Sequence, residues 1–99
     1  MFLVILRRSG PDYDHARPLE EQLGWDEHAA FMDGLVDDGV IVLGGVLGDE
    51  IRTAHAVRAS SEEEVRATFE RDPWSGSHLV IDSIDPWTIR LARASSETE

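Results

Sequence analysis

Apolar residues recur with two different periods along the chain, and the change from one period to the other predicts where strands and helices lie. Phe2–Leu6 is a continuous apolar run of strand length that ends at two arginines. Residues 9–24 form a connector rich in Asp and Pro, with one helical turn predicted at Pro18–Gln22. From Trp25 to Asp38 the period becomes helical. The apolar face of this predicted helix consists of His28, Phe31, Met32, Leu35 and Val36.

The middle of the chain has the pattern of a β-hairpin. Val40–Leu43 is a second continuous apolar run, which we expect to be closed by Gly44-Gly45, with an extension to Val46 and Leu47 as an alternative. Gly48-Asp49 is typical of a tight turn, and Ile51–Arg58 then forms the predicted return strand.

A second helix and a last strand complete the predicted elements. The helix begins at Ser60 or Ser61, because each has a Glu three residues later, the spacing of a capping box. Pro73 is expected to end it, since proline cannot continue a helix. The last strand is predicted at Leu79–Ile84, with a continuation to Leu91 as an alternative.

The order of these elements is β-α-β-β-α-β, the split βαβ or ferredoxin-like motif of an α+β domain. In this arrangement two helices cover one face of a four-stranded antiparallel sheet. The first two strands are apolar at consecutive positions, so the face without helices also requires cover. We therefore expect a homodimer that forms through the open sheet face. Residues 1–93 are predicted to form the single domain, and 94–99 a polar tail.

The charge of the chain argues against polyanionic partners. Nine Lys and Arg against twenty Asp and Glu give a formal net charge of −11. Such a surface repels nucleic acid and anionic membranes, so neither is an expected partner. The chain has no cysteine, which excludes thiolate chemistry and fits a cytoplasmic location. The apolar start is too short to span a membrane.

His28 is the most informative candidate, because it occupies a position on the apolar helix face where Leu or Met would pack better. A buried imidazole without a partner costs about 1–3 kcal/mol, so His28 is expected to have a partner or to face a pocket. One interpretation is a core histidine whose hydrogen bonds are satisfied. The other is a general base, oriented by a carboxylate on its second ring nitrogen.

Asp72 is the candidate for that carboxylate. It lies at the end of the second predicted helix, where the helix dipole disfavours a negative charge. An Asp before a proline is also a common helix-ending turn, so this interpretation stays open. Trp74 follows closely and is expected to line a pocket beside Asp72.

Other catalytic and binding motifs are not found in the sequence. His15, His55 and His78 do not share a metal-binding spacing with each other or with His28, so we expect no metal. The glycines match neither a phosphate-binding loop nor a dinucleotide fingerprint, and no nucleophile elbow occurs. We therefore expect no cofactor.

Taken together in order, these residues resemble the YCII-related (YciI-like) family over about positions 1 to 91. The resemblance is carried by Gly24-Trp25-Asp26-Glu27-His28-Ala29-Ala30-Phe31-Met32, Leu35, Gly39, Leu43-Gly44-Gly45 and Asp72-Pro73-Trp74. It implies a ferredoxin-like fold, a dimer of the dimeric α+β barrel type, and His28 with Asp72 as the paired active-site residues. One enzyme of this kind removes chloride from a chlorinated hydroxyhydroquinone, and other barrel relatives isomerise lactones or oxidise aromatic substrates without a cofactor.

Two departures from the family pattern limit what the resemblance implies. Many members have proline after the glycine pair, where this chain has Val46. The segment after the Asp-Pro step also differs, and reads Ser75-Gly76-Ser77-His78. The second departure lies in the expected pocket wall, so the resemblance does not predict the substrate.

The sequence therefore predicts a cofactor-independent enzyme of the lyase or isomerase type that acts on a small cyclic or aromatic molecule. His28 would abstract a proton or promote a dehydrochlorinase-like elimination, with Asp72 orienting it and Trp74 as an apolar wall for a flat substrate. The alternative is a non-catalytic homodimer that binds a small molecule or acts as an accessory module. Under that alternative His28 is structural.

Overall fold

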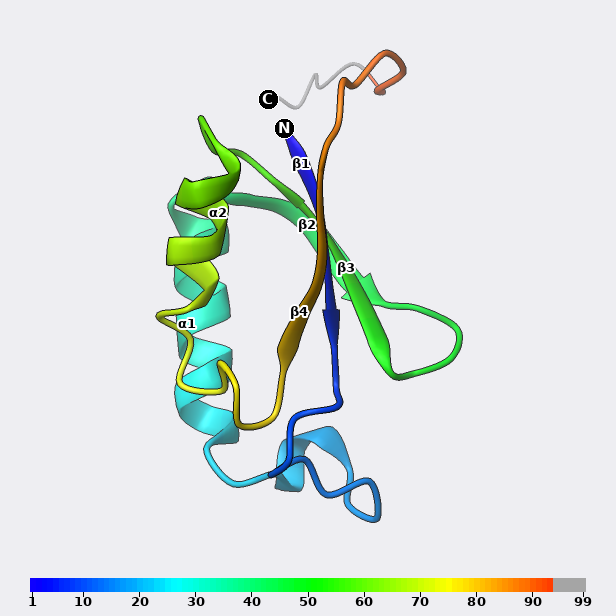
Figure 1. The fold of residues 1–99 in the computed structure, drawn as a ribbon, viewed down its shortest axis with the longest axis vertical. Coiled ribbons are helices and arrows are strands. Elements are labelled where there is room, and N and C mark those ends of the chain that lie inside the picture. The colour runs from blue at the N-terminus through cyan, green and yellow to red at the C-terminus, as the bar shows by residue number, and fades with distance from the viewer. Residues whose placement is uncertain (94–99) are drawn as a thin grey trace.

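A four-stranded antiparallel sheet forms the centre of the molecule, and both α-helices lie on one of its faces (Figure 1). The computed structural model describes residues 1–93, so the predicted tail at 94–99 lies outside the described residues. The elements are β1 (Phe2–Arg7), a 3-10 turn (Leu19–Glu21), α1 (Trp25–Asp37), β2 (Ile41–Val46), β3 (Arg52–Val57), α2 (Glu62–Phe69) and β4 (Val80–Pro86). The strand order is β2-β3-β1-β4, which fits the predicted ferredoxin-like topology.

The sheet register decides which side chains face the helices. Successive residues of a strand point to opposite faces, so Val4 and Leu6 of β1 face the helices while Leu3 and Ile5 face the other way. Val4 and Leu6 are accordingly buried, with 0% and 3% of their surface exposed. His55 lies opposite Val4 in the β1–β3 pair, which places it on the same helix-covered face.

The apolar core fills the space between the sheet and the helices. Its buried members come from all four strands or their ends, from both helices and from the connection after α2. They are Val4, Leu6, Leu35, Ile41, Val57, Val65, Phe69, Trp74 and Leu79. Trp74 is the largest fully buried side chain, with 1% exposed. Trp87, in contrast, lies just after β4 and is 42% exposed.

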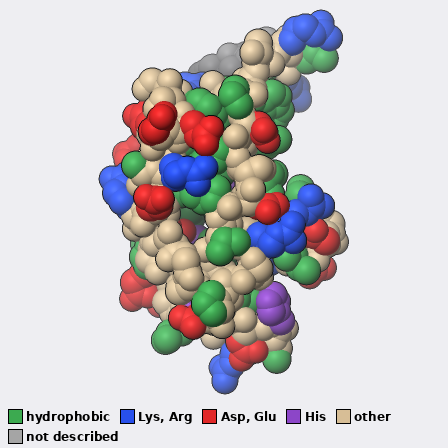
Figure 2. Space-filling model, viewed as in Figure 1, with side chains coloured by type: hydrophobic (Ala, Val, Ile, Leu, Met, Phe, Trp, Pro, Cys, Tyr) green, Lys and Arg blue, Asp and Glu red, His purple; other side chains and the backbone are tan. Residues whose placement is uncertain are grey.

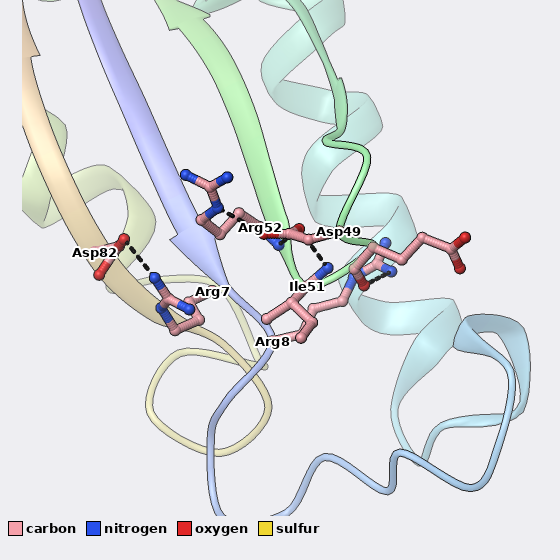
Figure 3. Close-up of polar contacts among 7 residues, drawn as sticks. Arg7, Arg8, Asp49, Ile51, Arg52 and Asp82 are labelled. Carbon is pink, nitrogen blue, oxygen red and sulfur yellow. Dashed lines mark hydrogen bonds and ion pairs between the residues drawn. The ribbon is translucent and has the colours of Figure 1, made fainter.

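The hairpin between β2 and β3 contains the predicted turn at Gly48-Asp49, where the backbone N–H of Glu50 donates to the Leu47 carbonyl at 2.9 Å. Of the two predicted ends of β2 the longer is nearer to the structure, because backbone pairing with β3 continues through Gly44-Gly45 to Val46. The connection spans residues 47–51 and is organised by Asp49, whose carboxylate accepts hydrogen bonds from the backbone N–H of Ile51 (2.9 Å) and Arg52 (3.0 Å) (Figure 3). The Asp49 side chain thus adds to the backbone bonds of the turn.

The second helix confirms one of its two predicted starts. The Ser61 hydroxyl accepts a hydrogen bond from the backbone N–H of Glu64 at 3.1 Å, so Ser61 is the N-cap. The Glu64 carboxylate returns to the backbone N–H and hydroxyl of Ser60, at 2.6 and 2.8 Å, rather than to Ser61 itself. These bonds lower the pKa of Glu64.

The ends of α2 and β4 also differ from the prediction. The helix ends at Phe69, before Pro73, because the chain enters a series of turns in which Asp72 donates its N–H to the Phe69 carbonyl. β4 ends at Pro86 and does not continue to Leu91; beyond the strand, the backbone N–H of Trp87 donates to the Met1 carbonyl at 2.9 Å.

The two broad surfaces of the molecule differ in character. Acidic and basic side chains are mixed over α2 on the face shown in Figure 2. On the sheet face without helices, Leu43 is 67% exposed and Leu3 and Ile5 are only half-buried. Within residues 1–93, neither helix has the length and apolar character needed to cross a bilayer.

Candidate functional site

His28 is held in the first turns of α1, where the chain turns sharply out of the preceding connector. Gly24 is the N-cap and adopts a left-handed φ of 83°, a conformation that favours glycine. The backbone N–H of His28 donates to the Gly24 carbonyl at 3.0 Å. A Cβ on Gly24 would lie 3.0 Å from Nε1 of Trp74, so the glycine also allows the helix to begin close to this indole. His28 is 8% exposed.

Asp72 is the hydrogen-bond partner of His28, although 44 positions separate them in the sequence. The Nδ1 atom of His28 lies 2.9 Å from Oδ1 and 2.8 Å from Oδ2 of Asp72, which is 5% exposed. Oδ1 also accepts the backbone N–H of Trp74 at 2.9 Å. Because an ionised carboxylate only accepts, Nδ1 carries the proton and Nε2 of a neutral His28 is left with a lone pair.

Trp74 packs face to face against His28. The ring centroids are 4.2 Å apart and the planes differ by 6°. A second imidazole, that of His78, stacks on Trp74 at 4.5 Å and 14°. The indole Nε1–H donates to the Leu23 carbonyl at 2.8 Å. Because only 1% of its surface is exposed, Trp74 has no free face on which a flat ligand could stack. Its role at the site is to hold the ring of His28 in place.

A cavity of about 420 Å³ lies beside His28, between α1 and the β2–β3 end of the sheet. Its apolar walls include Trp25 and Met32 from α1. The residues that line it are Leu6, Arg8, Leu19, Trp25, His28, Met32, Asp33, Val36, Ile41, Gly44, Gly45, Val46, Thr53, His55, Trp74 and Leu79. Asp72 is not among them and instead lines a second cavity of about 250 Å³ next to α2. His28 therefore separates its carboxylate partner from the larger cavity.

One residue that lines the larger cavity, Arg8, is bonded to the β2–β3 connection. Arg8 lines the cavity and donates from Nη1 to the Glu50 carbonyl at 3.1 Å (Figure 3). Arg52, on the neighbouring strand, is bound to Asp49 through Nε at 2.7 Å. The bond from Arg8 ties the connection to the chain just after β1, and the bond from Arg52 holds Asp49 against β3.

His55 is a cavity residue for which the sequence suggested no role. It is 7% exposed, and its Nδ1 lies 3.4 Å from the Val4 carbonyl oxygen. Burial lowers the pKa of His55 below its ordinary 6.5; the bond to Val4 opposes this shift and the neighbouring charge of His28 adds to it. The sequence did contain a signal for the position of His55. Thr53, His55 and Val57 alternate along the strand and so share one face, and an apolar residue such as Val57 is expected on the face that packs against the core.

The other two histidines lie elsewhere. His15 is exposed in the connector and packs its ring against Tyr13, with centroids 4.9 Å apart. His78 is buried, and its Nδ1 lies 3.0 Å from the Ser77 hydroxyl. In the part of the chain that the structure describes, no group of three or more His, Asp or Glu side chains is arranged to hold a metal ion.

No family model, no curated protein and no solved structure matches this chain.

Proposed function

We propose that this protein is a cofactor-independent enzyme of the lyase or isomerase type, in which Nε2 of His28 abstracts a proton from a small molecule bound in the larger cavity. The observation that carries the proposal is the bond from His28 Nδ1 to both carboxylate oxygens of Asp72, beside a cavity that Asp72 does not reach. Proton transfer of this kind requires no electron acceptor.

The division of roles follows from the position of each group. Asp72 fixes the Nδ1–H tautomer, so that Nε2 is available as a base, and offsets the positive charge that His28 gains when it takes the proton. Trp74 restrains the imidazole from its ring face, and cation–π attraction favours the protonated ring further. Return of the proton to a different atom gives isomerisation, and loss of a leaving group such as chloride gives elimination.

The cavity supports a small substrate. About 420 Å³ lies at the lower end of the range for small-molecule sites, which suits a molecule with one ring. Trp25 and Met32 contribute apolar surface. The net charge of −11 disfavours a strongly anionic substrate, and Arg8, the cavity's basic side chain, is already bonded to the Glu50 carbonyl.

Hydrogen–deuterium exchange tests this proposal at the step of proton abstraction, whatever the net reaction is. A panel of small cyclic ketones, lactones and substituted phenols is incubated with the protein in D₂O and followed by proton NMR. Hydroxyl and amino hydrogens exchange with D₂O without a catalyst, so only carbon-bound hydrogens are followed, either next to a carbonyl or on ring carbons ortho or para to a hydroxyl that has lost its proton. We expect protein-dependent deuterium incorporation at such a carbon in at least one compound, reduced about 100-fold or more in His28→Gln and Asp72→Asn. His15→Gln, which alters an exposed histidine outside the cavity, is the matched control and should exchange like the wild type.

The alternative is a non-catalytic homodimer that binds a small molecule. It predicts binding to the panel without exchange in any variant. The stability of His28→Ala alone does not separate the two functions, because removing His28 leaves the buried Asp72 carboxylate without its partner in either case. The exchange rate separates them, since only a working base moves the substrate proton.

We also propose that the chain is a member of the YCII-related family and forms a dimeric α+β barrel through its open sheet face. The sequence resemblance over residues 1–91 and the strand order β2-β3-β1-β4 support this proposal. Exposed apolar side chains on that face, Leu43 above all, support a second copy as the cover.

A further inference from the structure

We propose that His55 is a second ligand-contacting residue of the larger cavity, and that its Nε2 accepts a hydrogen bond from a hydroxyl or amino group of the same molecule that His28 deprotonates. This inference rests on the proposed function and extends it to the chemical class of the substrate. A buried strand position does not by itself require a histidine, and the proposed role in binding accounts for the imidazole there.

The sheet register brings His55 to the cavity wall. His55 of β3 lies opposite Val4 of β1 on one side and opposite Gly44 of β2 on the other. Nδ1 approaches the Val4 carbonyl oxygen at 3.4 Å, which directs that edge of the ring towards β1. The His55 ring atoms nearest to Gly44 of β2 are Cδ2 and Cγ, so this side of the ring lies towards β2. His55 and Gly44 both line the cavity.

Gly44 is the position that makes room for this ring. A Cβ at Gly44 would lie 2.6 Å from Cδ2 of His55 and 3.1 Å from the Ala54 carbonyl oxygen, closer than real Cβ contacts. At the neighbouring Gly45 a Cβ would meet no atom within 4 Å. The imidazole therefore occupies the space that a side chain on β2 would otherwise fill, beside a glycine that also lines the cavity.

The hydrogen bond to Val4 sets the tautomer of His55. A backbone carbonyl only accepts, so Nδ1 of His55 carries the proton and Nε2 of the neutral ring carries a lone pair. Burial disfavours the charged ring, which agrees with the neutral form near neutral pH. Nε2 of His55 is thus an acceptor that seeks a donor from the ligand.

The two histidines together define the ligand. His28 and His55 both present a lone pair on Nε2, since each has its Nδ1 proton bound to a fixed acceptor. A ligand that satisfies both must carry two hydrogen-bond donors, one of which is the acidic group that His28 deprotonates. A small ring with two hydroxyl groups, or with one hydroxyl and one amino group, fits this requirement and the cavity volume.

A purely structural His55 makes a different prediction. In that case the ring only fills space between Val4 and Phe69, whose ring centroid lies 5.9 Å away, and an apolar residue of similar size would serve as well. Ligand binding would then be unchanged when His55 is replaced by Leu. The two interpretations therefore separate on binding.

Binding of simple probe compounds tests the inference. The three dihydroxybenzene isomers, and the monomethyl ether of whichever isomer binds best, are titrated into wild type and His55→Leu by calorimetry. In the wild type we expect the diol to bind roughly 3- to 10-fold tighter than its ether, which has one donor fewer. In His55→Leu this ratio should fall to about one, while the affinity for the ether changes little.

A spectroscopic measurement on the wild type guards against misfolding of the variant. Long-range ¹H–¹⁵N correlation spectra distinguish an imidazole nitrogen that bears a proton from one that does not. We expect an unprotonated Nε2 on His55 that shifts on addition of the diol and does not shift with the dimethyl ether. A protonated Nε2, an unchanged Nε2 with bound diol, no binding of any diol, or an unchanged ratio in a folded His55→Leu would each overturn the inference.

These measurements are independent of turnover. If the diol binds through His55 and no compound exchanges its hydrogen for deuterium, the catalytic proposal fails and the assignment of His55 stands. If exchange depends on His28 and diol binding does not depend on His55, only the present inference fails.

Discussion

The ring of His28 lies parallel to the indole of Trp74 within 6°, with centroids 4.2 Å apart. The same Trp74 donates its backbone N–H to the Asp72 carboxylate that binds His28. One residue therefore restrains the imidazole from its face and its carboxylate partner from the backbone. The geometry of the pair depends on the Asp-Pro-Trp turn as a unit rather than on the two polar side chains alone.

Trp74→Phe should weaken the fold moderately. The smaller ring retains the stacking but loses the bond from Nε1 to the Leu23 carbonyl, at a cost of about 1–3 kcal/mol in the free energy of unfolding. Trp74→Ala should cost about 3–5 kcal/mol, because it leaves a cavity in the core. Urea unfolding measures both. Trp87→Phe is the control, and this exposed position should change stability by less than about 0.5 kcal/mol.

Asp72→Asn should reverse the tautomer of His28. The amide has the shape of the carboxylate, but its NH₂ group can donate to Nδ1, which moves the imidazole proton to Nε2 and removes the lone pair from the cavity side. Imidazole ¹⁵N shifts report the tautomer directly. Retention of the Nδ1–H form in a folded Asp72→Asn would show that the carboxylate does not set the orientation of His28.

The alternation of strands and helices could be predicted from the sequence because it depends on local periodicity. The apolar runs Phe2–Leu6 and Val40–Leu43 have strand length and coincide with β1 and the start of β2, and the Ser61 cap depends on a contact three residues away. The end of β2 stayed open at the level of sequence because Gly44-Gly45 pairs through its backbone, which leaves no trace in a hydrophobic pattern.

The site depends on contacts that a local pattern cannot show. The distance between His28 and Asp72 is set by how the turn after α2 packs against the start of α1, and only the family resemblance pairs the two at the level of sequence. His55 was missed because its face is decided by the register with Val4. A flat substrate was expected to stack on Trp74. In the structure His28 and His78 stack on the indole instead and leave it almost no exposed surface.

Gly44→Ala should destabilise the protein by about 1–3 kcal/mol. The added methyl group would overlap Cδ2 of His55, so the ring or the strand must shift. Gly45→Ala is the matched control on the same strand. Its methyl group meets open space, and the loss of glycine flexibility in the unfolded chain should leave stability unchanged or slightly higher. Equal effects of the two substitutions in denaturant titrations would contradict the close packing of His55.

Stability should fall as the pH is lowered through the ordinary pKa of histidine, and His55 should be responsible for part of this fall. Its pKa is lowered in the folded state, so below pH 6.5 the unfolded chain takes up a proton that the folded chain resists, which favours unfolding. The slope contributed by one such group is at most about 1.4 kcal/mol per pH unit.

The comparison of wild type with His55→Leu isolates this contribution, because His28 and its partner Asp72 are present in both proteins. The difference in the free energy of unfolding between the two proteins should be constant above about pH 7.5 and change steadily below pH 6.5, with His55→Leu the less sensitive to acid. Asp49 and Glu64, whose pKa values are lowered by hydrogen bonds, add stability that is lost only below about pH 4.5 and lie outside this window. A parallel pH dependence of the two proteins would contradict the lowered pKa of His55.

The proposed dimer predicts that one charge on the open sheet face separates the protomers. Leu3 and Leu43 both lie opposite Ala56 in their strand pairs, so the three form one apolar row across β1, β3 and β2. Leu43→Glu places a carboxylate in this row, where a second copy of an already acidic chain would bury it unpaired.

Light scattering at micromolar concentration should give about twice the chain mass of 11.0 kDa for the wild type and the single-chain mass for Leu43→Glu. Leu43 is 67% exposed within one protomer, so its substitution should leave the fold of the protomer intact. Leu23→Glu introduces the same charge at a side chain that is 87% exposed and lies before α1, away from the sheet, and should remain a dimer. If the wild type has the mass of a single chain, the proposed dimer is contradicted. A partner other than a second copy would then have to bury Leu43.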